Sequence, residues 1–259
     1  MSALKLKIVI IGAGNVAWHL GKELQKNDQE IVQIYNRSVE PALLLARRLK
    51  CDFTTRYDDL YAEADLYILA VKDAVIESVS KNLLLEDKLV VHTSGAIDQA
   101  KIKHERRGVF YPLQTFSKEK KLNFKSIPFC IEASKSQDYN TLMRLATLLS
   151  PKVYNINSHQ RKVLHVAAVF ACNFSNLMYM MADDILQKEK IPLDILQPLI
   201  KETALKITKL KPKEVQTGPA VRKDQSTINA HLDYLGKGVS FNVYEMLTQT
   251  ITAKNTDEL

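Results

Sequence analysis

The chain has 259 residues, 46% of them hydrophobic and 25% charged, which is typical of a folded globular protein and argues against intrinsic disorder. The formal net charge is +7, but the basic residues are scattered in short clusters, so we expect an anionic small molecule rather than nucleic acid as partner. Three widely separated cysteines, Cys51, Cys130 and Cys172, exclude a disulfide framework, and we expect no metal site.

The sequence predicts neither a targeting segment nor a membrane partner. An apolar strand begins within about eight residues of the start, and no cleavage site of small residues precedes it, so we expect no signal peptide. The longest apolar runs, such as 8–11 and 166–172, are too short to span a bilayer. Unpaired cysteines add to the expectation of a cytoplasmic protein.

Short apolar runs alternate with helical patterns over residues 1–155. These runs predict strands at 7–11, 31–35, 65–71, 88–92, 109–111, 128–132 and 153–156, with helical patterns at 15–25, 41–49 and 74–84. Strands that are buried on both faces and separated by helices indicate βαβ units and a parallel sheet. We therefore expect an α/β domain over 1–155, with a doubly wound Rossmann sheet.

Helical periodicity replaces the strand patterns over residues 156–259. It predicts helices at 159–190, 193–210, 226–235 and 239–252. Pro192 and Pro198 stand near the start of the second helix, and Pro212 follows its end, as prolines do at helix boundaries. We expect an all-α C-terminal domain.

The first strand leads into the sequence Gly12-Ala13-Gly14-Asn15-Val16-Ala17, which opens a helix. Gly12 permits a tight turn, Gly14 permits close approach of a pyrophosphate, and a small third residue allows the helix to pack against the strand. The helix N-terminus favours the anion, so Gly12, Gly14, Asn15 and Val16 are expected to bind a dinucleotide. The alternative is a plain strand-turn-helix whose glycines serve geometry alone.

The end of the second strand indicates which dinucleotide is bound. An NAD site usually has Asp or Glu here for the ribose 2′-hydroxyl, but no carboxylate occurs between Ile31 and Val39. Arg37 instead offers paired donors for a 2′-phosphate, with Asn36 and Ser38 beside it, which favours NADP(H). Ser38 is also a candidate helix N-cap.

Two later strands end at the same edge of the predicted sheet. Ala70, Val71 and Lys72 follow the third predicted strand, and their backbone is expected to line the nicotinamide-ribose half of the cofactor. Thr93 and Ser94 end the next strand and are candidates to bond the cofactor or substrate. The alternative for both is a Ser/Thr turn or a helix cap before Ala96.

A polar stripe is predicted on the helix at 159–190. At 100° per residue, Lys162, His165, Val169, Asn173 and Asn176 fall on one face. His165 has the chemistry of a general acid, and Asn173 could orient a substrate carbonyl or the cofactor amide. The alternative for His165 and Asn173 is that they are satisfied buried polar groups that set the helix register.

The motifs GAGNVA at 12–17, NRS at 36–38 and AVKD at 70–73 resemble the superfamily of pyrroline-5-carboxylate reductase, ketopantoate reductase and deazaflavin-linked NADP reductases. HTSGA at 92–96, YPLQTFS at 111–117, HVAAVFACN at 165–173 and TGPAVRKD at 217–224 resemble bacterial members with a helical domain of unknown function. The resemblance implies NADP-dependent oxidoreductase chemistry on a small-molecule substrate. It also implies a C-terminal domain like that of 6-phosphogluconate dehydrogenase, through which a homodimer forms.

Three further residues are expected to contact the substrate. Gln114 lies in the YPLQTFS motif, Arg222 could bind a substrate carboxylate with both donors, and His231 follows on the next helix. For Arg222 and His231 the alternatives are a turn residue and a lone histidine, and Asp224 is interpreted as a helix cap. Related hydroxyacid dehydrogenases place an asparagine four residues after a catalytic lysine, whereas here Lys162 is followed at that distance by Val166.

The sequence therefore predicts hydride transfer between NADP(H) and a small carbonyl or imine. The absent lysine-asparagine pair keeps open a non-catalytic NADP-binding sensor or partner protein. A methyltransferase also uses a glycine-rich loop, but Arg37 in place of an acid argues against it. No Gly-x-Ser-x-Gly elbow is present, so a hydrolase is not expected.

Overall fold

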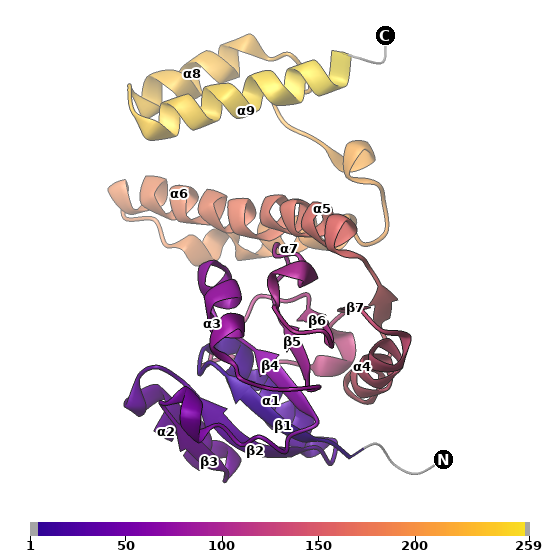
Figure 1. The fold of residues 1–259 in the computed structure, drawn as a ribbon. Coiled ribbons are helices and arrows are strands. Elements are labelled where there is room, and N and C mark those ends of the chain that lie inside the picture. Colours follow the sequence, from indigo (N-terminus) through magenta and orange to yellow (C-terminus); the bar gives the residue numbers. More distant parts are fainter. Residues whose placement is uncertain (1–4, 257–259) are drawn as a thin grey trace. The chain divides into compact units, whose positions relative to one another are not determined.

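The computed structural model describes residues 5–256, and the chain divides into two compact units, 1–169 and 170–259 (Figure 1). The first unit contains a single eight-stranded sheet, and the second is helical. This confirms the expected fold class of a Rossmann sheet followed by helices.

The sheet has the strand order β3-β2-β1-β4-β5-β6-β7-β8. Its first six positions follow the 3-2-1-4-5-6 order of dinucleotide-binding folds. All seven predicted strands are present, and β3 is an additional short one. The strands are β1 (Lys7–Ile11), β2 (Glu30–Tyr35), β3 (Asp52–Thr54), β4 (Leu66–Leu69), β5 (Leu89–His92), β6 (Arg107–Pro112), β7 (Phe129–Ala133) and β8 (Val153–Asn155).

One strand pair departs from the expected parallel sheet. β6 and β7 are antiparallel, with Phe110 opposite Ile131, while every other neighbouring pair is parallel. The connection between them contains only a short 3-10 turn, Phe124–Ser126, and no crossover helix. A parallel pair needs such a crossover, so the chain returns in the opposite direction.

Helices cover both faces of the sheet and bury two layers of apolar side chains. Along β1, Ile8 and Ile10 pack with the side chains of one layer, while Val9 and Ile11 pack into the other. The first layer includes residues of α1, α2 and α4, and the second includes residues of α3. The helices are α1 (Asn15–Lys26), α2 (Val39–Leu49), α3 (Ile76–Asn82), α4 (Ser136–Leu149) and α5 (Ser158–Ala168).

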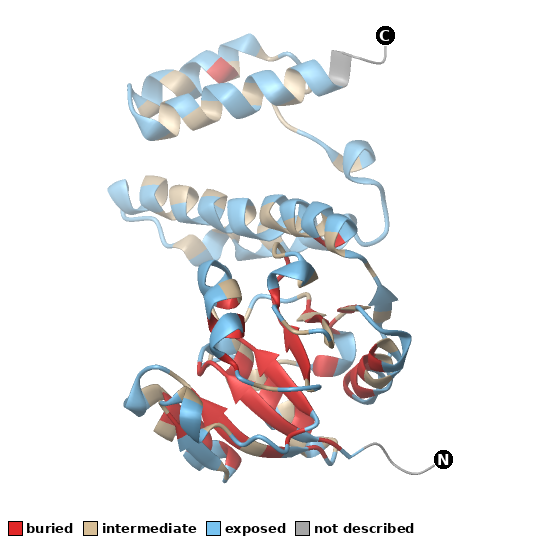
Figure 2. Cartoon of the chain, in the orientation of Figure 1, coloured by how far each residue is buried: buried red, intermediate tan, exposed pale blue. Residues whose placement is uncertain are grey.

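The helical unit contains few buried residues. Among residues 170–254, only Ala220 and Ile228 are buried, and Figure 2 shows the buried residues concentrated in the sheet unit. The predicted helix at 193–210 is shorter than expected: a 3-10 turn (Leu193–Leu196) leads into α7, and turns replace the helix after Lys206. The other helices are α6 (Ser175–Lys188), α7 (Gln197–Lys206), α8 (Gln225–Leu235) and α9 (Val239–Thr256).

The strands end at Asn155, where the sequence placed the domain boundary, but α5 belongs to the sheet unit. Arg161 on α5 is fully buried and binds residues that follow β5. By length and composition, the helical stretch Ser158–Lys188 is also the one described helix that could cross a membrane. The most apolar part of this stretch is not buried within the chain.

Candidate functional site at the carboxyl edge of the sheet

The turn between β1 and α1 has the geometry of a dinucleotide loop. Gly12 has a φ of +112°, and a Cβ there would lie 2.3 Å from the carbonyl oxygen of Ala70, so the position requires glycine. At Gly14, in contrast, a Cβ would meet no atom of the described residues within 4 Å other than those of its immediate chain neighbours. Ala17 is fully buried in the core beneath α1. The space beside Gly14 is therefore open to a ligand.

The N-terminus of α1 offers backbone donors to that space. Gly14 is the N-cap residue, no side chain caps the helix, and its first turn contains no acidic residue. Uncapped N–H groups and the helix dipole together favour an anion such as a pyrophosphate. Val16, predicted to contact the cofactor, is half-buried and packs partly against the core.

Asn15 connects the glycine loop to the segment after β6. Its side-chain amide donates a hydrogen bond to the carbonyl oxygen of Phe116 at 2.9 Å. One turn later, Nε2 of His19 lies 2.7 Å from the carbonyl oxygen of Ser117. The segment around Phe116 is thus fixed beside the first turn of α1. In this structure the side-chain amide of Asn15 binds that segment.

The residues after β2 stand at the carboxyl edge of the sheet. Asn36 and Arg37 follow the strand at its carboxyl end, and the side chain of Arg37 is exposed. Its guanidinium forms no ion pair with any carboxylate among residues 5–254. Asn36 donates through its side chain to the carbonyl oxygen of Ser38 at 2.9 Å. Ser38 is the N-cap residue of α2 but makes no side-chain cap bond.

The backbone after β4 lies directly beside the glycine loop. The N–H of Ala70 donates to the carbonyl oxygen of Ile11 at 2.8 Å, and the carbonyl oxygen of Ala70 contacts Gly12. Val71 is half-buried and Lys72 is exposed, at the start of the connection to α3. The backbone at Ala70–Lys72 therefore stands at the same edge of the sheet as the glycine loop.

Thr93 and Ser94 follow β5 at the same edge, and both are buried. The Ser94 hydroxyl oxygen accepts hydrogen bonds from the N–H groups of Ala96 and Ile97, each at 3.1 Å. For Ser94, the structure therefore shows the turn that the sequence left as an alternative. Thr93 donates through its hydroxyl to the carbonyl oxygen of Leu69 at 3.4 Å, which leaves its oxygen able to accept.

The side chain of His92 stabilises the turn that contains Ser94. Its Nδ1 accepts a hydrogen bond from the N–H of Ser94 at 3.1 Å, so the neutral ring carries its proton on Nε2. Burial disfavours the charged ring, and the nearby Arg161 guanidinium repels it, which together lower the pKa of His92 to about 3. His92 is a neutral structural residue at ordinary pH, and sequence reasoning did not identify it.

Arg161 ties α5 to the same turn. Its guanidinium donates to the carbonyl oxygens of Ser94, at 3.2 Å, and of Ile97. It also pairs with Glu132 on β7 at 2.7 Å. Ser158 completes the cluster, donating to the Glu132 carboxylate at 2.7 Å. A fully buried arginine is stable only with such partners, and here they hold α5 on the carboxyl edge of β5.

Tyr111, Gly95 and His165 converge one helical turn after Arg161. The Tyr111 hydroxyl lies 3.5 Å from Nδ1 of His165, and the two rings meet edge to face. A Cβ on Gly95 would lie 2.7 Å from that Nδ1 and 2.8 Å from the Tyr111 oxygen. The structure thus places His165 beside Gly95, in the turn that follows Ser94. Tyr111 lies in the YPLQTFS motif, but no signal in the sequence assigns it a role.

Asn173 is exposed and lies in a π-helical segment, Val169–Phe174. A π turn closes with i→i+5 hydrogen bonds and so takes more residues per turn than an α-helix. The polar stripe is predicted with a period of 100° per residue. Because the π turn changes this period, Asn173 and Asn176 do not continue the face as predicted. Within residues 5–169, the stripe retains Lys162 and His165.

The three predicted substrate residues have local partners or exposed positions. The Gln114 side-chain oxygen accepts from the N–H of Thr115 at 2.8 Å. In the helical unit, Arg222 is exposed, and Nδ1 of His231 lies 2.8 Å from the hydroxyl of Tyr244. Asp224 caps α8 by accepting from the N–H of Thr227 at 3.1 Å, which confirms the cap interpretation.

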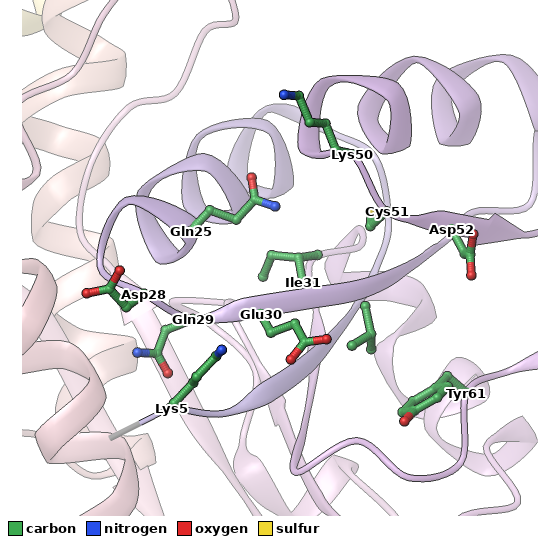
Figure 3. Close-up of a pocket in the computed structure, with 11 residues that line it drawn as sticks. Lys5, Gln25, Asp28, Gln29, Glu30, Ile31, Lys50, Cys51, Asp52 and Tyr61 are labelled. Atoms are coloured by element: carbon green, nitrogen blue, oxygen red, sulfur yellow. The ribbon is translucent and has the colours of Figure 1, made fainter. Parts of the chain in front are cut away.

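A depression of about 1050 Å³ lies at the opposite, amino edge of the sheet (Figure 3). It is lined by residues that begin strands or precede them, including Lys5, Glu30 and Asp52. The glycine loop, Arg37 and Ser94 all stand at the carboxyl ends of strands, so this depression is separate from the candidate site. Residues 5–256 contain no cluster of His, Cys, Asp or Glu suited to a metal ion.

Two protein families match the chain in succession. An NADP oxidoreductase family, described as coenzyme F420-dependent, matches residues 7–95, and a domain of unknown function, DUF2520, matches residues 127–251. A proposed NADP oxidoreductase from Bacteroides fragilis, solved as a crystal structure, is 42% identical. The match covers 97% of this chain and all of that one, with a TM-score of 0.92.

More distant solved structures share the fold. A 1-pyrroline-5-carboxylate reductase from Streptococcus pyogenes is 16% identical over 98% of this chain and 99% of its own, with a TM-score of 0.64. An imine reductase from Myxococcus stipitatus, in complex with NADP+, is 13% identical over 97% and 93%, with a TM-score of 0.67. A comparison with curated protein sequences finds no match.

Proposed function

Because the chain belongs to the family that joins an NADP oxidoreductase domain to a DUF2520 domain, we propose that it transfers hydride between NADP(H) and a small carbonyl or imine. The observation that carries this proposal is the open glycine loop together with Arg37, at neighbouring strand ends of one sheet. Neighbours in the fold are named as a 1-pyrroline-5-carboxylate reductase, an imine reductase and a reductive aminase.

The residues at the sheet edge suit NADP(H). Gly14 leaves room for the pyrophosphate, and the uncapped turn at Asn15–Ala17 supplies its donors. Arg37, unpaired with any carboxylate of the described chain, would pair with the 2′-phosphate, and a carboxylate that would prefer NAD is absent from 31–39. The match to an F420-linked family makes F420 the competing cofactor to test.

His165 is proposed as the proton donor. Bound NADPH supplies a hydride to the substrate carbon; the chain must then protonate the oxygen or nitrogen. The imidazole of His165 is half-buried beside the turn that follows β5, and imidazole is the side chain most often used in general acid–base catalysis. Thr93 and the backbone at Ala70–Lys72 would line the cofactor. Asn173, Gln114, Arg222 and His231 remain candidates for substrate contact.

We also propose that the helical unit pairs with a second copy of the chain. With two buried residues among positions 170–254, this unit has no core of its own, whereas Leu177 and Met180 on α6 and Phe174 just before it are exposed. Arg161 anchors the first turns of the same helical stretch to the sheet unit, which favours a protein partner over a lipid bilayer.

Sedimentation velocity should give a dimer for the wild type and a monomer for Leu177→Asp/Met180→Asp. Leu84→Asp, at an exposed site on the sheet unit, is the control that should remain dimeric.

Turnover tests the enzymatic part of the proposal. NADPH oxidation is measured across a panel of 2-keto acids, ketones and cyclic imines with the wild type and His165→Ala. We expect turnover of at least one panel member and a loss of about 100-fold in kcat for His165→Ala. NADPH binding without turnover of any panel member would instead support a non-catalytic sensor, the alternative function.

A further inference from the structure

We infer that Tyr111 is a positioning residue for His165: its hydroxyl binds Nδ1 and leaves Nε2 as the nitrogen that delivers the proton. This inference rests on the proposed function for its chemical meaning. The contact between the two residues can be tested without a substrate.

Three segments meet at this contact. Tyr111 stands near the carboxyl end of β6, His165 lies on α5, and Gly95 belongs to the turn after β5. The hydroxyl-to-Nδ1 distance is 3.5 Å, long for a hydrogen bond, and such catalytic contacts often shorten when ligands bind. Gly95 has no φ that requires glycine, yet a Cβ would collide with both rings, at 2.7 Å and 2.8 Å. The rings of Tyr111 and His165 therefore fit together only because Gly95 has no side chain.

Arg161 holds the helix in place for this contact. It lies four residues before His165, one turn away on the same face of α5. Its bonds to the carbonyl oxygens of Ser94 and Ile97 fix the helix against the turn that contains Gly95. Nδ1 of His165 thus faces Gly95 and Tyr111, and Nε2 is on the other side of the ring.

A tyrosine hydroxyl suits both protonation states of the ring. It can accept from Nδ1–H of the imidazolium and of the neutral ring that remains after Nε2 has lost its proton, and it can donate to Nδ1 of the other neutral tautomer, because it has one donor and two acceptor lone pairs. During reduction, the substrate carbon gains a hydride and its oxygen or nitrogen gains the Nε2 proton. The imidazolium becomes neutral, keeps the proton on Nδ1 with the tyrosine oxygen as its hydrogen-bond acceptor, and regains the Nε2 proton from water.

Nuclear magnetic resonance of the ring nitrogens tests the contact directly. Long-range 1H–15N spectra are recorded for the wild type and for Tyr111→Phe, with and without NADPH, and His165→Asn identifies the His165 signals. The chain supplies a matched control, because Tyr244 pairs with Nδ1 of His231 at 2.8 Å. Tyr111→Phe should shift the Nδ1 signal of His165 and not that of His231, while Tyr244→Phe should do the reverse.

Gly95→Ala provides a second route to the same contact. Its added methyl group should displace one ring and shift the His165 Nδ1 signal as Tyr111→Phe does. With any substrate that the panel identifies, Tyr111→Phe should lower kcat by about tenfold and leave the Kd for NADPH within about twofold. An unchanged His165 Nδ1 signal in Tyr111→Phe overturns the inference. Failure of NADPH to bind would overturn the proposed function, and the ligand-free spectra would still decide this contact.

Discussion

Arg161 Nε donates a hydrogen bond to the carbonyl oxygen of Ser94 at 3.2 Å, across 67 positions of sequence. This bond joins the helix that contains His165 to the turn that follows β5. The same guanidinium pairs with Glu132, so one buried side chain connects α5, β7 and the edge of the candidate site. The position of His165 follows from this cluster.

Removing one member of the buried ion pair should destabilise the sheet unit strongly. Arg161→Met leaves the Glu132 carboxylate without its cation, and we expect a loss of about 3–5 kcal/mol in the free energy of unfolding. Arg161→Met/Glu132→Gln removes both charges and should recover part of that loss. Urea denaturation measures all three proteins. A double variant less stable than Arg161→Met would contradict this account of the pair.

The two glycines of the phosphate loop should respond differently to alanine. Gly12→Ala introduces a Cβ 2.3 Å from the Ala70 carbonyl oxygen at a φ of +112°, so it should cost at least about 2 kcal/mol of stability. Gly14→Ala meets open space and should fold like the wild type, but its methyl group should weaken NADPH binding by about tenfold or more. Thermal unfolding and calorimetric titration separate the two effects. Equal loss of stability in both variants would rule out the ligand-facing role of Gly14.

His92 should make the protein less stable as the pH falls. Its folded pKa of about 3 lies below the ordinary 6.5, so between these values the unfolded chain binds a proton that the folded chain does not. Stability is therefore fully present above pH 6.5 and is lost progressively as the pH falls toward 3. Melting temperatures of the wild type and His92→Asn, compared between about pH 7.5 and about pH 4.5, measure this contribution. The variant should lose less stability over that range; parallel curves would exclude His92 as the cause.

Local patterns predicted the strands, the glycine loop and Arg37, because each depends on residues close together in sequence. The apolar run at Lys7–Ile11 and the two glycines that follow it are readable without tertiary contacts. Strand direction is different: the run at Phe129–Ala133 has the same composition in either orientation. Only the connection from β6, which lacks a helix, makes this strand antiparallel.

The parts of the site that escaped prediction depend on distant partners. In the sequence, Arg161 has the pattern of a surface charge on an amphipathic helix. Its partner Glu132 lies 29 positions earlier, so the sequence does not indicate that the two residues pair. Tyr111 stands near the end of strand β6, and its role depends on His165, which lies 54 positions later in the sequence. Asn173 was placed by a regular helical period, which the π turn interrupts. Glu132 and Gly95 give no signal in a single sequence, because the partners of Glu132 are distant in sequence and the φ of Gly95 is one that any residue can adopt.

Calorimetric titration of NADPH and NADH into the wild type and Arg37→Glu tests the central claim, that this edge of the sheet binds NADP(H). We predict that the wild type binds NADPH at least about tenfold more tightly than NADH, which corresponds to about 1.4 kcal/mol. Arg37→Glu should reverse that preference, because its carboxylate repels a 2′-phosphate and accepts from a 2′-hydroxyl. Equal affinities for the two dinucleotides in the wild type, or no binding of either, would contradict the account.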